Sequence, residues 1–227
     1  EVFFMIIDEQ IHIEWSYSKN FHQTDTIKRL GEDYKKYIQC LLDDKPPFFL
    51  PSQQPNKIET AKPLADKTAI VTGASRGIGR YIALRLAKQG ARLVLVARSK
   101  PDLDDVAAEI ANQGGEAMVI PTDICQLEQV EAMLKQVVQW SGGVDILINN
   151  AGLTEFSSVV DSDPAQWRSV IETNLFGTYY CCRTVLPIMM QGRQGKIINI
   201  GADASHISYP LFSAYSSSKH GQLGFAK

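Results

Sequence analysis

The stretch TAIVTGASRGIG, at residues 68–79, decides the fold of this chain. It begins with the short, β-branched apolar residues of a buried strand and continues into a turn that contains Gly73, Gly77 and Gly79. Gly73 permits a sharp turn, Gly77 lets the backbone approach a phosphate, and Gly79 allows the next helix to pack closely. A glycine triplet alone is weak evidence, but a strand before it and a helix after it make it specific. We therefore expect a dinucleotide pyrophosphate at the N-terminus of this helix.

Outward from this turn, strand and helix patterns alternate along the chain from residue 67. Five short apolar runs are predicted as buried strands: Ala69 to Val71, Leu93 to Val96, Met118 to Ile120, Ile146 to Ile148 and Ile197 to Ile200. The helices between and after them are predicted at Gly77 to Gln89, Lys100 to Asn112, Gln126 to Ser141, Pro164 to Met190 and from Ala214 onward, with Ser99 and Asp163 as N-caps. This order predicts an α/β fold, a doubly wound parallel sheet with helices on both faces.

The segment before this sheet has a different composition and predicts a second, smaller unit. Residues 43–66 are rich in proline, which blocks helix and central strand, and we interpret them as a linker. Upstream, Gln10 to Tyr17 alternates as a strand does, and a helix is expected from Asp25 or Thr26 to about Leu42. The domains expected are residues 1–42, a strand-helix remnant of another domain, the linker at 43–66, and residues 67–227, the dinucleotide-binding domain.

Composition and charge exclude several classes of protein. The 227 residues are 44% apolar and 21% charged, with a net charge of -2, so neither nucleic acid nor an anionic membrane is an expected partner. The four cysteines have no CxxC spacing and no histidine partners, so we predict no metal site and no disulfide framework. The apolar run Val2 to Ile7 is too short for a membrane span and lacks a basic lead. These features favour a cytoplasmic protein.

The end of the second predicted strand indicates the type of nicotinamide cofactor. An acidic side chain there would accept hydrogen bonds from an adenosine ribose, but this chain has Ala97 and Arg98. Arg98 and Arg76 can bind a 2′-phosphate, so we predict NADP(H), the alternative being that both arginines are solvated surface charges. Asp123 is expected to accept a hydrogen bond from the adenine amino group. For Asn149 and Asn150 the alternative is that they serve only as turn residues. The predicted cofactor-binding residues are Gly73, Ser75, Arg76, Gly77, Ile78, Gly79, Arg98, Asp123, Ile124, Asn150, Ala151, Gly152, Tyr215 and Lys219.

Five motifs in order make the chain resemble the short-chain dehydrogenase/reductase family over residues 67–227. They are the TGxxxGxG turn, Asp123, the NNAG run at residues 149–152, Asn174, and YxxxK at Tyr215 and Lys219. The resemblance implies a Rossmann-type sheet and an NADPH-dependent oxidoreductase that reduces a ketone or aldehyde. It implies that Tyr215 is the general acid and that Asn174 holds a water chain to Lys219. Lys219 is then expected to bind the nicotinamide ribose and to lower the pKa of the phenol from about 10.

One departure from the family pattern bears on catalysis. The family usually has a serine thirteen positions before the tyrosine, where it hydrogen-bonds the substrate carbonyl, and this chain has Ala202. Loss of such a donor costs on the order of a hundredfold in rate, roughly 3 kcal/mol. Ser205 is three residues further on and either replaces it or is an ordinary loop hydroxyl. A catalytically silent nucleotide-binding or docking domain is therefore the alternative function.

A second resemblance concerns the first forty residues. Ile13-Glu14-Trp15-Ser16-Tyr17-Ser18 and the residues after it are similar to the C-terminal end of a condensation or epimerization domain of a nonribosomal peptide synthetase. The HHxxxDG motif of that family is missing, so we expect no condensation activity, and an unrelated hairpin and helix is the alternative. The resemblance implies a reductase within a multidomain megasynthase, acting on a carrier-bound carbonyl. There are two other possibilities. The protein is a homo-oligomer, or it is a free-standing metabolic reductase to which the first sixty residues do not belong.

The ends of the chain raise one more expectation. In the family the sheet continues with two further strands and a substrate-covering segment after the helix that starts near Ala214. This sequence has none of these elements, which would leave the flank of the fifth strand and the helix faces exposed, so we expect poor solubility or no activity of the isolated chain. Glu1 in place of a methionine also suggests a fragment.

Overall fold

The structure, a computed structural model, describes residues 2–7, 10–15 and 62–226. The chain divides into two units, Glu1–Glu59 and Thr60–Lys227, and the boundary falls within the linker predicted at residues 43–66. In the first unit β1 (Val2–Ile7) pairs antiparallel with β2 (Gln10–Trp15). The strand predicted from residue 10 is therefore present, whereas the helix predicted at residues 25–42 lies outside the described residues.

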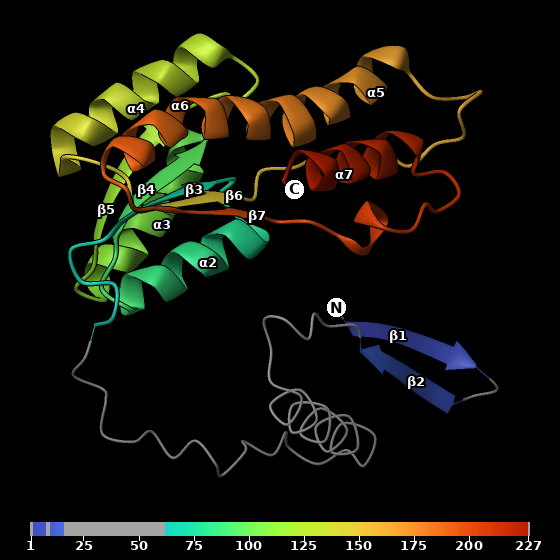
Figure 1. The fold of residues 1–227 in the computed structure, drawn as a ribbon, viewed down its shortest axis with the longest axis horizontal. Coiled ribbons are helices and arrows are strands. Elements are labelled where there is room, and N and C mark those ends of the chain that lie inside the picture. The colour runs from blue at the N-terminus through green and yellow to red at the C-terminus, as the bar shows by residue number, and fades with distance from the viewer. Residues whose placement is uncertain (1, 8–9, 16–61, 227) are drawn as a thin grey trace. The chain divides into compact units, whose positions relative to one another are not determined.

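The second unit contains the predicted parallel sheet, whose five strands lie in the order β5-β4-β3-β6-β7. The strands are β3 (Thr68–Thr72), β4 (Arg92–Ala97), β5 (Glu116–Pro121), β6 (Ile146–Asn149) and β7 (Lys196–Asn199). The chain adds β4 and β5 on one side of β3 and then crosses back to add β6 and β7 on the other (Figure 1). All neighbouring pairs are parallel, so the doubly wound α/β fold is confirmed.

Helices cover both faces of this sheet (Figure 1). One face packs on α2 (Gly77–Lys88) and α3 (Lys100–Asn112), and the other on α4 (Leu127–Ser141) and α6 (Gly177–Gln191). Successive strand residues point to opposite faces, so Ile70 joins the α4 and α6 core while its neighbour Val71 joins the α2 and α3 core. The three inner strands β3, β4 and β6 are buried on both faces and are mostly apolar, as the sequence predicted.

The long helix predicted from Pro164 to Met190 contains a local change that the sequence did not indicate. The structure has α5 (Pro164–Ile171), a π-helical turn η2 (Glu172–Phe176) and then α6, in direct succession. The π-helical turn carries Asn174, which is fully buried. Such single π-helical turns are frequent at functional sites. The predicted helical stretch is therefore confirmed, with one π-helical turn inside it.

The two predicted N-caps differ in the structure. The carboxylate of Asp163 accepts a hydrogen bond from the backbone N–H of Ala165 at 2.9 Å, as a capping residue should. Ser99 occupies the N-cap position of α3, but its side chain makes no capping hydrogen bond. Ser99 instead lines the cavity that is described in the next section.

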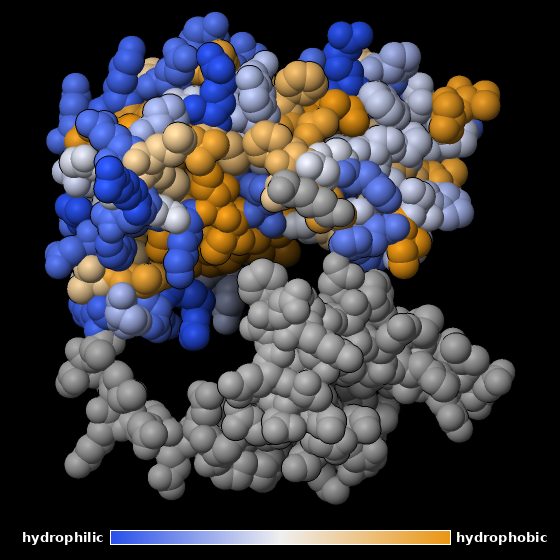
Figure 2. All heavy atoms as spheres, in the orientation of Figure 1, coloured by the Kyte–Doolittle hydropathy of each residue, from blue (hydrophilic) through white to orange (hydrophobic). Residues whose placement is uncertain are grey.

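The outer strand β7 leaves one flank of the sheet uncovered in the described part of the chain. Ile198 in this strand is 45% exposed, and hydrophobic surface gathers over the region of β7 (Figure 2). In the same described residues, no helix has the length and apolar character needed to cross a membrane.

Candidate active site

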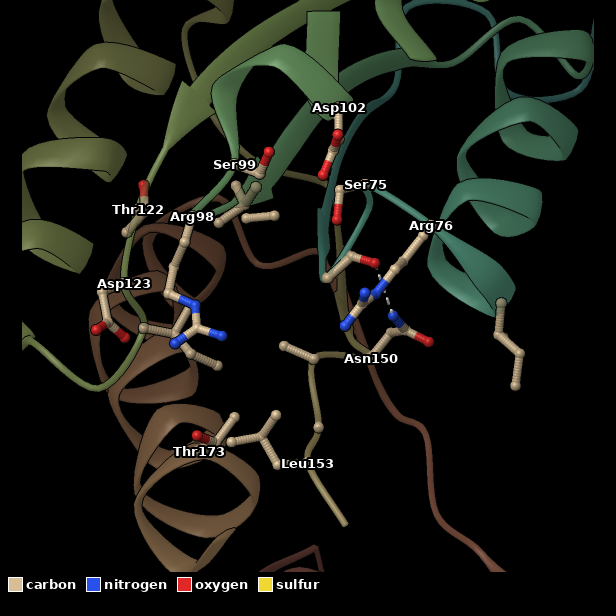
Figure 3. Close-up of a pocket in the computed structure, with 17 residues that line it drawn as sticks. Ser75, Arg76, Arg98, Ser99, Asp102, Thr122, Asp123, Asn150, Leu153 and Thr173 are labelled. Atoms are coloured by element: carbon tan, nitrogen blue, oxygen red, sulfur yellow. Dashed lines mark hydrogen bonds between the residues drawn. The ribbon is translucent and has the colours of Figure 1, made fainter. Parts of the chain in front are cut away.

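The site lies at the carboxyl ends of the parallel strands, beside the point where the strand order reverses. The segment after β3 leads to α2 on one face and the segment after β6 leads towards α5 and α6 on the other. The two connections therefore diverge and leave a crevice between them. A cavity of about 660 Å³ occupies this place (Figure 3). It is lined by Gly73, Ser75, Arg76, Ile78, Val96, Ala97, Arg98, Ser99, Asp102, Thr122, Asp123, Ile124, Asn150, Ala151, Gly152, Leu153 and Thr173.

Close backbone approach in the turn after β3 requires the glycines. Gly73 has φ +66°, and a Cβ atom on Gly79 would lie 2.2 Å from the carbonyl oxygen of Gly73. Gly77 has φ +55°, and a Cβ atom there would meet nothing within 4 Å. Its neighbours Arg76 and Ile78 line the cavity, so the N-terminal end of α2 lies at the cavity. The first backbone N–H groups of a helix attract anions, and this turn therefore fits a phosphate.

The loop after β6 is bound to the turn after β3 through Thr72, a residue that sequence reasoning did not assign to the site. The hydroxyl of Thr72 accepts from the backbone N–H groups of Asn150 and Ala151, both at 3.0 Å. The side-chain amide of Asn150 donates to the Thr72 carbonyl oxygen at 2.9 Å. Asn150 thus satisfies backbone groups, as the alternative interpretation had it, and it also lines the cavity. The amide of Asn149 instead donates to Asn199 on the neighbouring strand β7.

Two arginines reach into the cavity from different elements. Arg76 comes from the N-terminal end of α2 and Arg98 from the end of β4, and in Figure 3 their guanidinium groups approach the same space from opposite sides. Ser99 and Asp102, from the start of α3, line the cavity as well and were missed from the sequence. Asp102 belongs to the first turn of α3. Its place beside the cavity follows from the fold and could not be read from the sequence.

The far wall holds Asp123 and Ile124, as predicted. One carboxylate oxygen of Asp123 accepts from the backbone N–H of Cys125 at 3.0 Å, which fixes the side chain at the edge of the cavity. Ile124 is only 7% exposed and packs closely against the start of α6, where a Cβ atom on Gly177 would lie 2.5 Å from its Cδ1. Together the glycine turn, the two arginines and this wall fit a nicotinamide dinucleotide with an additional phosphate.

Asn174 connects this cavity to the helix that carries the predicted catalytic pair. Its side-chain oxygen accepts from the backbone N–H of Leu153 at 2.7 Å, and its amide donates to the Leu153 carbonyl at 2.9 Å. The same amide donates to the hydroxyl of Ser218 at 2.9 Å, and that hydroxyl donates to the carbonyl oxygen of Tyr215 at 2.7 Å. The helix α7 (Ser213–Phe225) is therefore bound to the wall of the cavity.

Lys219 lies one helical turn beyond Tyr215 and is 4% exposed. Its Nζ donates to the carbonyl oxygen of Ile200 at 2.6 Å and to the side-chain oxygen of Gln222 at 3.1 Å. The same nitrogen lies 5.8 Å from the centroid of the Tyr215 ring. Burial lowers the pKa of Lys219 to about 8, because the charged form loses its hydration.

The expectation that Lys219 lowers the pKa of Tyr215 is not met. The pKa of Tyr215 is raised, first by burial and then by the nearby carboxylate of Asp203. The physical reason is that the Lys219 ammonium donates its hydrogen bonds to Ile200 and Gln222, while the phenol is half-buried beside a negative charge. The phenol of Tyr215 therefore keeps its proton at neutral pH, which suits a proton donor.

The structure also bears on the missing serine. Ser205 is 5% exposed, and its hydroxyl oxygen accepts from the backbone N–H of Ala202 at 3.2 Å. It belongs to the 3₁₀ turn η3 (Asp203–Ser205), which it stabilises. This geometry favours the ordinary loop role for Ser205 over the replacement of the serine. No group of three or more His, Cys, Asp or Glu side chains in the described part of the chain is placed to hold a metal ion.

Comparison with known proteins identifies the family. The short chain dehydrogenase family matches residues 67–227. The 3-oxoacyl-(acyl-carrier-protein) reductase of Staphylococcus epidermidis is 39% identical over 163 residues, which cover 71% of this chain and 67% of that protein. The corresponding reductase of Synechocystis is 36% identical over 165 residues, which cover 72% of this chain and 67% of that protein.

Solved structures give the same result. A putative short-chain alcohol dehydrogenase from Sinorhizobium meliloti superposes with a TM-score of 0.69 at 35% identity, over 71% of this chain and 64% of that one. A metagenomic short-chain oxidoreductase in complex with NADP superposes with a TM-score of 0.69 at 38% identity, over 71% of this chain and 74% of that one. The chain belongs to the short chain dehydrogenase family, a family of oxidoreductases. It spans about two thirds of the length of these relatives, and the matched family region begins at residue 67, so the condensation-domain resemblance of the first forty residues stays a prediction.

Proposed function

We propose that this chain reduces a ketone or aldehyde to an alcohol with NADPH, using Tyr215 as the proton donor. The observation that carries the proposal is the placement of Lys219, buried beside the Tyr215 ring on a helix that Asn174 binds to the cavity wall. NADPH, when bound, supplies the hydride. The phenol of Tyr215 gives its proton to the carbonyl oxygen, so the carbonyl takes up one hydride at carbon and one proton at oxygen to become the alcohol, with the cofactor left oxidised and Tyr215 left as phenolate. The phenolate then recovers a proton from solvent.

The residues of the chain divide the binding task between two ends of the cavity. Arg76 and Arg98 carry permanent positive charge and can bind a 2′-phosphate by paired hydrogen bonds, which favours NADPH over NADH. At the other end, Gly152 leaves room beside Asn174, since a Cβ atom there would lie 3.3 Å from the Asn174 side-chain oxygen. The nicotinamide half is expected to lie there, next to Tyr215 and Lys219.

We infer that the carbonyl is delivered on a carrier. The relatives from Staphylococcus epidermidis and Synechocystis are named as reductases of 3-oxoacyl-(acyl-carrier-protein), which supports a carrier-bound carbonyl for this chain. The resemblance of residues 1–42 to the end of a condensation domain supports a carrier of a peptide-synthesising assembly line. A cytoplasmic location, with neither nucleic acid nor membrane as partner, accords with the net charge of -2.

Ala202 motivates the second candidate, a domain that binds nucleotide without turnover. A donor to the carbonyl oxygen is missing at this position, and Ser205 is buried in its own turn. One experiment separates the two functions: the full-length protein is mixed with NADPH and a 3-oxoacyl thioester or simple ketones, and binding and oxidation of NADPH are both followed. Oxidation that falls at least about a hundredfold in Tyr215→Phe supports the reductase. Binding without oxidation of any substrate in the panel supports the silent domain.

A further inference from the structure

Gln222 is a buried polar residue that the predicted mechanism does not use. It lies on α7 three residues after Lys219, on the same side of the helix, and is 2% exposed. Its side-chain oxygen accepts from Lys219 Nζ at 3.1 Å, and its amide nitrogen donates to the hydroxyl of Thr178 at 2.9 Å. The amide nitrogen also lies 3.5 Å from the backbone carbonyl oxygen of Asn174.

The orientation of this amide follows from chemistry. Lysine nitrogen in its charged form can only donate, so the oxygen of Gln222 must face Lys219. The nitrogen of Gln222 then faces Thr178 and the carbonyl of Asn174, and both can accept. Thr178 itself donates to the Asn174 carbonyl at 2.9 Å, so its oxygen is free to accept from Gln222. Every polar atom of the amide is matched, which a buried amide requires.

This arrangement joins Lys219 to the π-helical turn through side-chain atoms of the chain itself. Gln222 spans the interval between Lys219 and the carbonyl oxygen of Asn174 directly, and the water chain that the family resemblance implies between these residues stays a prediction. The ammonium of Lys219 has two acceptors in the described part of the chain, Ile200 and Gln222. A buried ammonium depends on its acceptors, because each hydrogen bond to a charged group offsets part of the lost hydration.

We propose that Gln222 is a positioning residue, which keeps Lys219 charged and fixed beside Tyr215 by connecting it to Thr178 and Asn174. The proposal rests on the proposed function for its consequence in catalysis, but the contact itself can be tested without turnover. The reaction needs a cation at Lys219 to bind the ribose hydroxyls, so a weaker hold on this ammonium reduces the fraction of active protein as pH rises.

The test uses two substitutions with opposite expected effects. Gln222→Met keeps the approximate size but removes the acceptor, so the pKa of Lys219 should fall by about one unit. Gln222→Glu replaces the neutral acceptor with a negative one, so that pKa should rise by about one unit or more. The pKa is measured by NMR titration of the full-length protein with ¹³Cε-labelled lysine, and Lys219→Arg identifies the resonance. Opposite shifts support the proposal, and no shift or two shifts of the same sign would overturn it.

The control is a substitution in the same helix that leaves the contact intact. The hydroxyl of Ser216 is buried without a hydrogen-bond partner in the described part of the chain, so Ser216→Ala should leave the Lys219 titration unchanged. A shift as large as that of Gln222→Met would show that any change in α7 has this effect and would contradict the proposal. If Gln222→Met does not fold, Thr178→Val removes the Gln222 partner without touching α7 and should lower the same pKa by a smaller amount.

The pH profile of kcat gives the second measurement. The basic limb should move to lower pH in Gln222→Met and to higher pH in Gln222→Glu, with a smaller change in the KM for substrate. If the NMR shifts occur but no variant oxidises NADPH, the reductase proposal fails and the role of Gln222 stands. If the wild-type protein is active and neither substitution shifts the titration, the role of Gln222 alone fails.

Discussion

The side-chain amide of Asn174 donates to the hydroxyl of Ser218 at 2.9 Å, and that hydroxyl donates to the backbone carbonyl oxygen of Tyr215 at 2.7 Å. Ser218 is completely buried. It therefore joins the π-helical turn, which also holds the cavity loop through Leu153, to α7, the helix that carries the proposed proton donor. The position of Tyr215 relative to the cavity depends on this contact as well as on the packing of α7.

Ser218→Ala should weaken both stability and catalysis. Loss of a buried hydrogen bond typically costs about 1–2 kcal/mol of the free energy of unfolding, and a shift of α7 should lower kcat more than it raises the KM for NADPH. Denaturant unfolding and steady-state kinetics measure the two effects. Ser217→Ala is the matched control, because the neighbouring Ser217 is exposed. Equal behaviour of the two variants would contradict the structural role given to Ser218.

Arg98→Asp should change the preferred cofactor. The carboxylate would repel a 2′-phosphate and accept hydrogen bonds from an unphosphorylated ribose, so the ratio of kcat/KM for NADPH to that for NADH should fall by at least about tenfold. The measurement is the pair of kinetic constants for the two cofactors. Arg85→Asp serves as a control, since Arg85 is exposed on α2 and does not line the cavity. An unchanged ratio in Arg98→Asp would refute the assignment of the 2′-phosphate to this side chain.

Ala202→Ser should increase turnover. A hydroxyl at this position restores a donor to the carbonyl oxygen, and a well-oriented donor of this kind contributes on the order of a hundredfold in rate. Single-turnover kinetics with saturating NADPH would measure the gain. A serine that gives no gain would mean that position 202 does not face the reacting carbonyl.

Ser205→Ala should leave turnover unchanged and reduce stability. Its hydroxyl is buried and accepts from the backbone N–H of Ala202, so its loss removes about 1 kcal/mol from the free energy of unfolding without touching substrate. Kinetics and thermal unfolding of the same preparation separate the two effects. A large drop in kcat at unchanged stability would restore the hypothesis that Ser205 replaces the family serine.

Much of the fold could be predicted from the sequence because its signals are local. Buried strands such as Ala69 to Val71 are short and rich in β-branched residues. Position 79 requires glycine, because a Cβ atom there would collide with the carbonyl oxygen of Gly73. The π-helical turn at Glu172–Phe176 could not be predicted in this way, because periodicity over a few residues does not distinguish one extra residue in a turn. The missing capping hydrogen bond of Ser99 could not be predicted either, because the preference for serine at an N-cap does not fix the direction of its side chain.

The candidate site shows the same division. The glycine turn, the arginines and the YxxxK pair are set by residue type and spacing, so they could be assigned before the structure was known. Thr72, Ser218 and Gln222 could not, since each acts through partners distant in the sequence: Thr72 bonds residues 150 and 151, and Gln222 bonds Thr178. The raised pKa of Tyr215 was missed for a related reason. Burial and the neighbouring Asp203 outweigh a lysine whose hydrogen bonds go elsewhere.

The pH dependence of activity should be set by Lys219 on the basic side. The proposed reduction needs a protonated Lys219 and a protonated Tyr215. Burial lowers the pKa of Lys219 from 10.5 to about 8, and the pKa of Tyr215 is raised above its ordinary value. The rate should therefore be level below about pH 7 and fall as pH rises through about 8, while Tyr215 remains protonated. In Lys219→Arg the group stays charged, so any remaining activity should lose this limb. A limb that persists near pH 8 in that variant would assign it to another group.

Stability should respond to pH in the opposite direction. Between about pH 8 and 10.5 the folded protein holds a neutral Lys219 and the unfolded chain a charged one, so the unfolded state binds more protons and the Lys219 contribution to stability rises with pH. Below pH 8 the full cost of the buried charge is present, about 3 kcal/mol for a shift of this size. Denaturant unfolding of the wild type and of Lys219→Met between pH 7 and 10 gives the difference in their free energies of unfolding. As pH rises, the wild type should become more stable relative to Lys219→Met. A difference that stays constant over this interval would show that Lys219 is not buried as the structure has it.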